Sequence, residues 1–293
     1  MKHTIENDWL RITVDDHGAE LISIYDKEKE REVLWQADPA YWQRHAPILF
    51  PHVGKHYHNE YRYHGKTFHT HQHGFARDME FSCIEKTSRS VTHRLQSSDE
   101  TKSYFPFEFS LDVIHSLNGR DLTVTWKVVN FDLDTMYFTI GGHPAFRVPI
   151  LPDTVQTDYL LLFHTFLNHL DYLLLDPETG TAVKETSYQL PLTQGRAAIS
   201  SDLFDHDALI FDDTQIEWAA IGYPDGTPYI SISCEGFPNF GIWSVPGAPY
   251  ICLEPWIGRC DDFSFTGEIS EKPGIISLPS KETFMRNYTI TVY

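Results

Sequence analysis

The sequence predicts an all-β protein, a large antiparallel β-sandwich, and two observations support this. Apolar and polar residues alternate with period two in many short runs, which is typical of strands that bury one face. Turn residues separate these runs, and no segment shows a long apolar stripe at helical spacing. A jelly roll is the nearest alternative architecture.

The alternating runs are spread along the whole chain, at Leu10–Val14, Phe109–Val113, Leu122–Val128, Ile230–Ile232 and Tyr288–Val292. Between runs, turn signals occur at residues 26–32, at Asn118-Gly119 and at Pro224-Asp225-Gly226. The clearest predicted hairpin pairs Phe109–Leu117 with Leu122–Asn130. The apolar segment Leu160–Leu175 fits a helix or a strand followed by a loop.

Composition limits the class of protein. A chain of 293 residues can form one large β domain, so we expect a single domain over residues 1–293. The formal net charge of −18 argues against nucleic acid or an anionic membrane as partner, because both need clustered cations. A phosphorylated metabolite stays possible, since it needs only a few local cations.

Location and assembly are predicted from absences in the sequence. No apolar run could span a bilayer, and Met1-Lys2-His3-Thr4 does not begin a signal-peptide pattern. We therefore expect a soluble cytoplasmic protein, either a monomer or a homodimer. The four cysteines are scattered without a C-x-x-C pair, which predicts free thiols at Cys83, Cys234, Cys252 and Cys260.

The hexapeptide Gly141-Gly142-His143-Pro144-Ala145-Phe146 is the most informative local feature. Glycines have no Cβ, so they let the backbone bend and a ligand approach closely. Pro144 biases His143 toward an extended conformation at the end of an apolar strand. A histidine held in this way is suited to proton transfer; a turn with an unremarkable polar residue is the alternative.

A second segment, from Pro47 to Phe81, is rich in histidine: eight of the sixteen histidines lie between His45 and His73. Their alternation predicts one strand face carrying His69, His71 and His73, which suits either a metal site or a solvated strand. Arg77 has donors that suit a polyhydroxylated or anionic ligand, or it pairs with Asp78 or Glu80 on the surface.

A third segment runs from Tyr250 to Arg259. It predicts Glu254 at the end of a short apolar strand, before Pro255. A carboxylate against apolar surface has a raised pKa, which suits a general base; a structural hydrogen bond to the backbone is the alternative. Trp256 offers an apolar platform for the face of a sugar.

The three segments together carry a resemblance. They resemble motifs of the aldose 1-epimerase (galactose mutarotase-like) family, in the same order along the chain. The matching motifs are Pro-Ile-Leu-Phe-Pro followed by His-Gly-Phe-Ala-Arg, then Gly-Gly-His-Pro-Ala-Phe, then Leu-Glu-Pro-Trp. They are most similar to its LacX-type bacterial branch, associated with lactose and galactose operons. The resemblance covers nearly the whole chain and implies the galactose mutarotase-like supersandwich fold.

The resemblance also implies roles for individual residues. The family's general base matches Glu254, its general acid matches His143, and a histidine that contacts the sugar matches His73. An aspartate that binds the sugar hydroxyls matches Asp207, favoured slightly, or Asp205.

One segment departs from the family pattern. Better-known members carry an Asn-Arg pair whose arginine touches the substrate, where this chain has Gly54-Lys55-His56-Tyr57-His58-Asn59. Lys55 is the candidate replacement cation, but an ammonium cannot reproduce the bidentate contact of a guanidinium. The sugar preference therefore stays open.

The implied reaction interconverts the α and β anomers of a hexose such as galactose or glucose, and it needs no metal and no organic cofactor. Three alternatives remain. One is a sugar-phosphate epimerase of the same fold, its phosphate held by Lys55, Arg77, Arg147 or Arg259. Another is a non-catalytic carbohydrate-binding or sensing protein. The third is a metal-dependent, cupin-like β protein that uses the histidine-rich segment.

Overall fold

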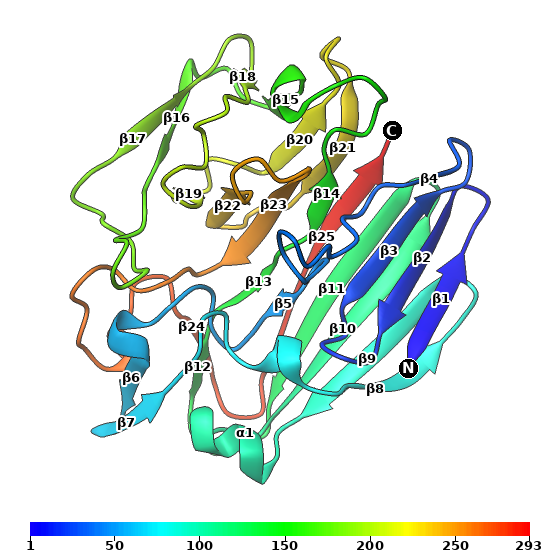
Figure 1. The fold of residues 1–293 in the computed structure, drawn as a ribbon. Helices are drawn as coiled ribbons and strands as arrows, with labels where there is room; N and C mark the ends of the chain where they lie inside the picture. Colours follow the sequence, from blue (N-terminus) through cyan, green and yellow to red (C-terminus); the bar gives the residue numbers. More distant parts are fainter.

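The computed structural model describes all residues 1–293 and confirms the predicted all-β antiparallel architecture (Figure 1). The only α-helix, α1, spans Asp99–Tyr104, and the 3₁₀ turns are Tyr57–Asn59, Ala76–Asp78, Gln156–Asp158 and Ile269–Glu271. No helix here has the length and apolar character needed to cross a membrane.

The largest element is a nine-stranded sheet that forms the back of the molecule in Figure 1. In spatial order its strands are β18 (Arg196–Ala198), β15 (Leu160–Phe163), β20 (Trp218–Gly222), β21 (Pro228–Ser233), β25 (Thr283–Val292), β11 (Asp121–Asn130), β10 (Phe109–Asn118), β9 (Ser90–Gln96) and β8 (Ser82–Lys86). The ambiguous segment from Leu160 is thus strand β15 followed by a loop and then β16 (His169–Tyr172), not a helix.

The predicted hairpin lies at the centre of this sheet. β10 and β11 pair from Phe109 with Asn130 to Asn118 with Asp121, and Gly119 takes the left-handed conformation in the turn. Along β11, buried residues alternate with half-buried ones as the period-two pattern predicts. The predicted turn at Pro224-Asp225-Gly226 likewise joins β20 to β21.

A six-stranded sheet packs face to face on the middle of the nine-stranded one. It contains β19 (Leu209–Phe211), β22 (Asn239–Trp243), β23 (Tyr250–Ile257), β13 (Ile140–Gly142) and β5 (Ile48–Leu49), with β14 (Ala145–Arg147) also paired to β23. The two sheets approach closely, because a Cβ on Gly142 would lie 2.7 Å from the hydroxyl of Tyr288 on β25.

An N-terminal sheet covers the other end of the nine-stranded sheet (Figure 1). It consists of β1 (Lys2–Glu6), β2 (Leu10–Asp15), β3 (Leu21–Asp26) and β4 (Arg31–Glu32). Three smaller ribbons pair β12 (Met136–Phe138) with β24 (Ile276–Leu278), β16 with β17 (Tyr188–Pro191), and β6 (Glu60–Tyr63) with β7 (Lys66–His69). One connected apolar core draws on all three large sheets.

The prediction that His69, His71 and His73 share a strand face is wrong. β7 ends at His69, and the chain then turns, with His73 in the left-handed conformation at φ 68°. His69 and His71 are exposed while His73 is buried, so the three side chains do not converge on a metal. Sequence alternation alone did not show where the strand stops.

Candidate active site

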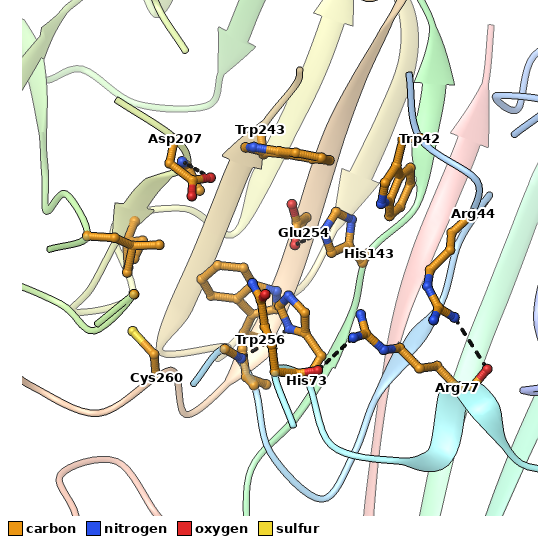
Figure 2. A pocket seen from close by; sticks show the side chains of 17 residues that line it. Trp42, Arg44, His73, Arg77, His143, Asp207, Trp243, Glu254, Trp256 and Cys260 are labelled. Atoms are coloured by element: carbon orange, nitrogen blue, oxygen red, sulfur yellow. Dashed lines mark hydrogen bonds and ion pairs between the residues drawn. The ribbon is translucent and has the colours of Figure 1, made fainter. Parts of the chain in front are cut away.

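A pocket of about 390 Å³ opens on the outer face of the six-stranded sheet (Figure 2). This volume falls in the range of about 300–1,000 Å³ typical of small-molecule sites. The pocket is lined by Trp42, Arg44, Val53, Gly54, Gln72, His73, Arg77, His143, Leu175, Gly180, Asp207, Ala208, Ile210, Trp243, Glu254, Trp256 and Cys260. All three predicted sequence segments therefore contribute to one pocket.

Glu254 and His143 face each other at the centre of the pocket (Figure 2). His143 Nε2 lies 3.4 Å from Glu254 Oε2, and both side chains are more than nine-tenths buried. His143 follows directly after β13, as predicted for a histidine at the end of a strand. We refer to these two residues as the acid–base pair.

The predicted position of Glu254 at a strand end is wrong, since it lies in the middle of β23. On one side Glu254 pairs with Gly241 of β22. On its other side the partner changes from β14 to β13, and His143-Pro144 occupies the gap between them. This gap explains why Pro255, which lacks an N–H donor, is tolerated inside the strand.

Burial favours the uncharged form of both members of the pair. It raises the pKa of Glu254 well above its usual value, and the nearby Asp207 carboxylate raises it further. Burial also lowers the pKa of His143 to about 3, and the guanidinium groups of Arg77 and Arg44 contribute. Burial therefore favours the neutral carboxyl and neutral imidazole over the ion pair.

His73 is held as a hydrogen-bond donor to the pocket. The backbone N–H of Gly54 donates to His73 Nδ1 at 3.1 Å, so in the neutral ring the proton sits on Nε2. Burial, followed by the nearby His143 and Arg77, keeps the pKa of His73 well below its usual value. A neutral His73 can therefore donate from Nε2 to a ligand oxygen.

Three tryptophans form apolar walls around the pair, and sequence reasoning identified only Trp256. Trp42 stacks on the His143 ring with centroids 4.8 Å apart, and Trp243 meets the same ring edge-on at 5.6 Å. Trp42 lies in a loop five residues before Pro47, outside the motif, so no pattern in the sequence marked it. Aromatic faces of this kind suit the C–H face of a pyranose.

The glycines of the motif have a different use from the one predicted. A Cβ on Gly141 would lie 2.5 Å from Trp256 Cδ1, and a Cβ on Gly241 of β22 would lie 2.4 Å from the same indole ring. Gly142 instead faces Tyr288 in the core. These glycines make room for protein aromatic rings, and only through Trp256 do they shape the pocket for a ligand.

Two arginines lie together at one end of the pocket (Figure 2). Arg77 Nη2 donates to the carbonyl of Gln72 at 2.7 Å, and Arg44 Nη2 donates to Asp78 at 2.7 Å. Burial and the adjacent Arg44 lower the pKa of Arg77 to about 10. Asp78 is the ion-pair partner of both guanidinium groups, and the Glu20 carboxylate lies near enough to Arg77 to raise its pKa. The sequence predicts Arg77 as a ligand-binding residue, whereas Arg44 carries no sequence signal.

Asp207 lies at the opposite end of the pocket from the arginines (Figure 2). It has a left-handed backbone, φ 71°, and its carboxylate accepts the N–H of Ala208. Asp205 and Lys55 line an adjoining groove that shares Asp207 but not the acid–base pair. The structure thus brings Asp207, rather than Asp205 or Lys55, into the same pocket as Glu254.

The other predicted cations do not reach the pocket. Arg259 is held by two carboxylates, 2.9 Å from Asp212 and 2.8 Å from Asp262. Arg147 is an exposed residue of β14 and is not among the lining residues. Neither arginine is placed to clamp a substrate phosphate here.

A thiol also lies next to the acid–base pair. A ring nitrogen of His143, the Sγ of Cys252 and a carboxylate oxygen of Glu254 lie within 4.8 Å of one another. Burial raises the pKa of the Cys252 thiol far above its usual value, and Glu254 adds to this shift. Cation binding there would need both acidic groups to lose their protons, which these raised pKa values oppose.

The aldose 1-epimerase family profile matches residues 1–268. The chromosomal LacX protein of Lactococcus lactis subsp. lactis is 30% identical over 298 residues, covering 98% of both chains. The galactose mutarotase related enzyme of Lactobacillus acidophilus superposes with a TM-score of 0.94 at 32% identity, covering 100% of this chain and 97% of that one. A galactose mutarotase-like protein of Lactobacillus casei ATCC 334 gives 0.92 at 31% identity, with both chains fully covered.

These findings define the class: the fold is that of the galactose mutarotase-like proteins. The chain belongs to the aldose 1-epimerase family, and within it the LacX protein is a full-length relative.

Proposed function

We propose that this protein is an aldose 1-epimerase that interconverts the α and β anomers of a hexose such as galactose or glucose. The observation that carries the proposal is the acid–base pair, in contact at 3.4 Å inside a tryptophan-walled pocket. Ring opening needs one group to take a proton and another to supply one, and these two side chains can share a single proton between them.

In the proposed reaction the base is Glu254 and the acid is His143. Glu254 takes the proton of the C1 hydroxyl while protonated His143 gives a proton to the ring oxygen O5. The C1–O5 bond breaks and O1 becomes a carbonyl oxygen. After rotation about C1–C2, the ring closes on the other carbonyl face and both protons return.

Substrate binding must supply the charged form of the pair. Sugar hydroxyls that donate to the Glu254 carboxylate favour its ionised state, which moves the pair's proton to His143. The neutral His73 supplies a further donor, and Asp207 supplies an acceptor for sugar hydroxyls at the far end of the pocket.

The test is the rate of anomer exchange, followed by polarimetry from pure α-galactose and α-glucose. We expect the protein to accelerate exchange and Glu254→Gln to lose about 10²- to 10⁴-fold in rate while still binding sugar. Glu235→Gln, at an exposed glutamate outside the pocket, is the matched control. Sugar binding by the unaltered protein with no acceleration would instead identify a carbohydrate-binding protein.

A phosphorylated hexose is a second candidate substrate, and the paired Arg44 and Arg77 favour it. The two guanidinium groups lie beside His143, and paired arginines are the kind of group that binds a phosphate. If the substrate carries a phosphate there, galactose 6-phosphate will be preferred over galactose. Arg44→Gln will then lower kcat/KM for the phosphate ester far more than for the free sugar, and Arg147→Gln will lower neither. An equal loss on both sugars would contradict a phosphate site.

A further inference from the structure

A second cluster of histidine, cysteine and carboxylate side chains lies outside the pocket, near the N-terminus. One ring nitrogen each of His3 and His93 and the Sγ of Cys83 lie within 4.8 Å of one another. The carboxylate of Asp16 lies beside both imidazoles. None of these four residues lines the catalytic pocket. We call His3, Asp16, Cys83 and His93 the N-terminal cluster.

The fold fixes this cluster at the junction of two sheets. Cys83 and His93 are directly opposed on β8 and β9 of the nine-stranded sheet, and the register shifts just after Cys83. His3 comes from β1, which lies against β9 at this edge (Figure 1).

Asp16, just after β2, is anchored from both sides of the junction. Its N–H donates to the carbonyl of Met1, and its own carbonyl accepts the N–H of Phe81. Backbone bonds to both sheets thus hold the carboxylate in place before any ligand arrives.

The carboxylate lies between the two imidazole rings. Asp16 Oδ1 is 2.8 Å from His3 Nε2 and 3.2 Å from His93 Nε2. The hydrogen bonds from the N-terminal ammonium of Met1 and from His3 outweigh the effect of burial and hold the pKa of Asp16 below its usual value. The N-terminal ammonium of Met1 also lies 3.0 Å from Asp16 Oδ2.

His93 is the member whose hydrogen bonding is incomplete. Its side chain is fully buried, and neither ring nitrogen has a hydrogen-bond partner of good geometry. In the neutral ring, one of these two nitrogens carries a lone pair that no group of the protein uses. A buried polar group without a partner is costly unless a ligand satisfies it, and a neutral imidazole is the form that binds a metal.

We propose that the N-terminal cluster binds a Zn²⁺-type divalent transition-metal cation. A ring nitrogen each from His3 and His93 and the sulfur of Cys83 lie within 4.8 Å of one another, and the Asp16 carboxylate contacts both imidazoles. These side chains are of the kinds that tetrahedral zinc takes as ligands. Mg²⁺ and Ca²⁺ are disfavoured because they prefer oxygen ligands. On binding, the Cys83 thiol loses its proton to solvent, so affinity rises with pH.

Such an ion would join β1 of the N-terminal sheet to β8, an edge strand of the nine-stranded sheet. Its role is structural, since it lies outside the acid–base pocket. The proposal does not depend on the proposed epimerase activity.

The test uses the full chain, stripped with a chelator and then titrated with Zn²⁺ alone by calorimetry. We expect one equivalent to bind and to raise Tm, because a ligand that binds only the folded state stabilises it. Co²⁺ in place of Zn²⁺ should give the visible absorption of a tetrahedral site together with a thiolate-to-metal band.

Two variants assign the site. His3→Ala and Cys83→Ser change partly exposed positions that the fold tolerates, and each should weaken Zn²⁺ binding by at least about tenfold, since even outer-shell changes cost about 10- to 100-fold. His17→Ala, at an exposed histidine next to Asp16 in the chain, is the matched control and should bind normally.

Three results would overturn the proposal. One is no saturable binding by the stripped protein. Another is binding that both His3→Ala and Cys83→Ser leave unchanged. The third is binding that disappears in Glu254→Gln instead, which would move the ion to the His143, Cys252 and Glu254 group.

Discussion

The pocket and the N-terminal cluster contain the same three kinds of side chain in opposite electrostatic settings. In the pocket, no cation compensates the buried Glu254, so its pKa rises and the group keeps a proton to transfer. In the N-terminal cluster, an ammonium and an imidazole compensate Asp16, so its pKa falls and the anionic form is favoured. The three-dimensional surroundings of a carboxylate, more than its neighbours in a sequence motif, therefore decide whether it transfers protons or binds a ligand.

The largest expected difference between the two regions is in catalysis. His143→Gln removes the proposed acid and should lower the mutarotation rate by about 10²- to 10⁴-fold, whereas His17→Gln at the surface should leave it unchanged. Polarimetry measures both rates. If His3→Gln slowed the reaction as much as His143→Gln, the two regions would not be independent.

The two carboxylates should respond oppositely to replacement by an amide. Glu254 has a raised pKa in the folded state, so its stabilising contribution is complete below about pH 4.5 and is lost as the pH rises. The free energy of unfolding of Glu254→Gln should therefore exceed that of the wild type. The difference should grow by about 1.4 kcal/mol for each pH unit above 4.5 over which Glu254 stays protonated in the folded wild type.

Asp16 has a lowered pKa, so its contribution is present above its unfolded pKa of 3.8 and is lost as the pH falls. Asp16→Asn should therefore be less stable than the wild type at neutral pH. Urea unfolding of both variants at several pH values measures the sign of each change in the free energy of unfolding. Destabilisation of both variants at pH 7 would break the contrast.

His115 isolates the effect of burying a histidine with no carboxylate beside it. Burial, followed by the nearby His93, lowers its pKa to about 3, so its stabilising contribution is present above pH 6.5 and is lost as the pH falls toward 3. His115→Leu should remove this dependence. The stability of the variant relative to the wild type should then be about 2 kcal/mol more favourable at pH 5 than at pH 8. Equal relative stabilities at the two pH values would contradict this.

The smallest expected effect is that of removing a bound metal ion, which should change the stability of the fold and not the reaction rate. A chelator should lower Tm by a few degrees if Zn²⁺ occupies the N-terminal cluster, as expected for about 1 kcal/mol in a chain of this size. The mutarotation rate at 25 °C should stay the same, because the acid–base pair needs no metal. Differential scanning fluorimetry and polarimetry on one sample measure both quantities.

Sequence reasoning reached the β architecture, the β10–β11 hairpin and the segments that meet in the pocket. Each of these depends on local chemistry, such as period-two burial and turn residues between strands. The same reasoning misplaced Glu254 at a strand end and grouped His69, His71 and His73 on one face. Both errors concern where a strand stops, which the neighbouring strands decide.

The residues that sequence reasoning missed are those without a local signal. Trp42 and Arg44 lie in a loop and enter the pocket only because the chain folds over the six-stranded sheet. The N-terminal cluster likewise joins residues from β1, β8, β9 and the turn after β2, far apart in the chain. No sequence motif with a fixed spacing describes residues so far apart in the chain.

By itself, the sequence determined that the chain forms paired strands with one buried face, and that His143 follows a strand beside glycines. These properties follow from side-chain periodicity and backbone freedom, which act over a few residues. Only the tertiary structure decided that Gly141 and Gly241 seat Trp256, that Asp207 lies in the pocket with Glu254 while Asp205 lies outside it, and that His93 is buried without a hydrogen-bond partner. The physical reason is that burial and pKa depend on which strands become neighbours, and distant parts of the chain supply those neighbours.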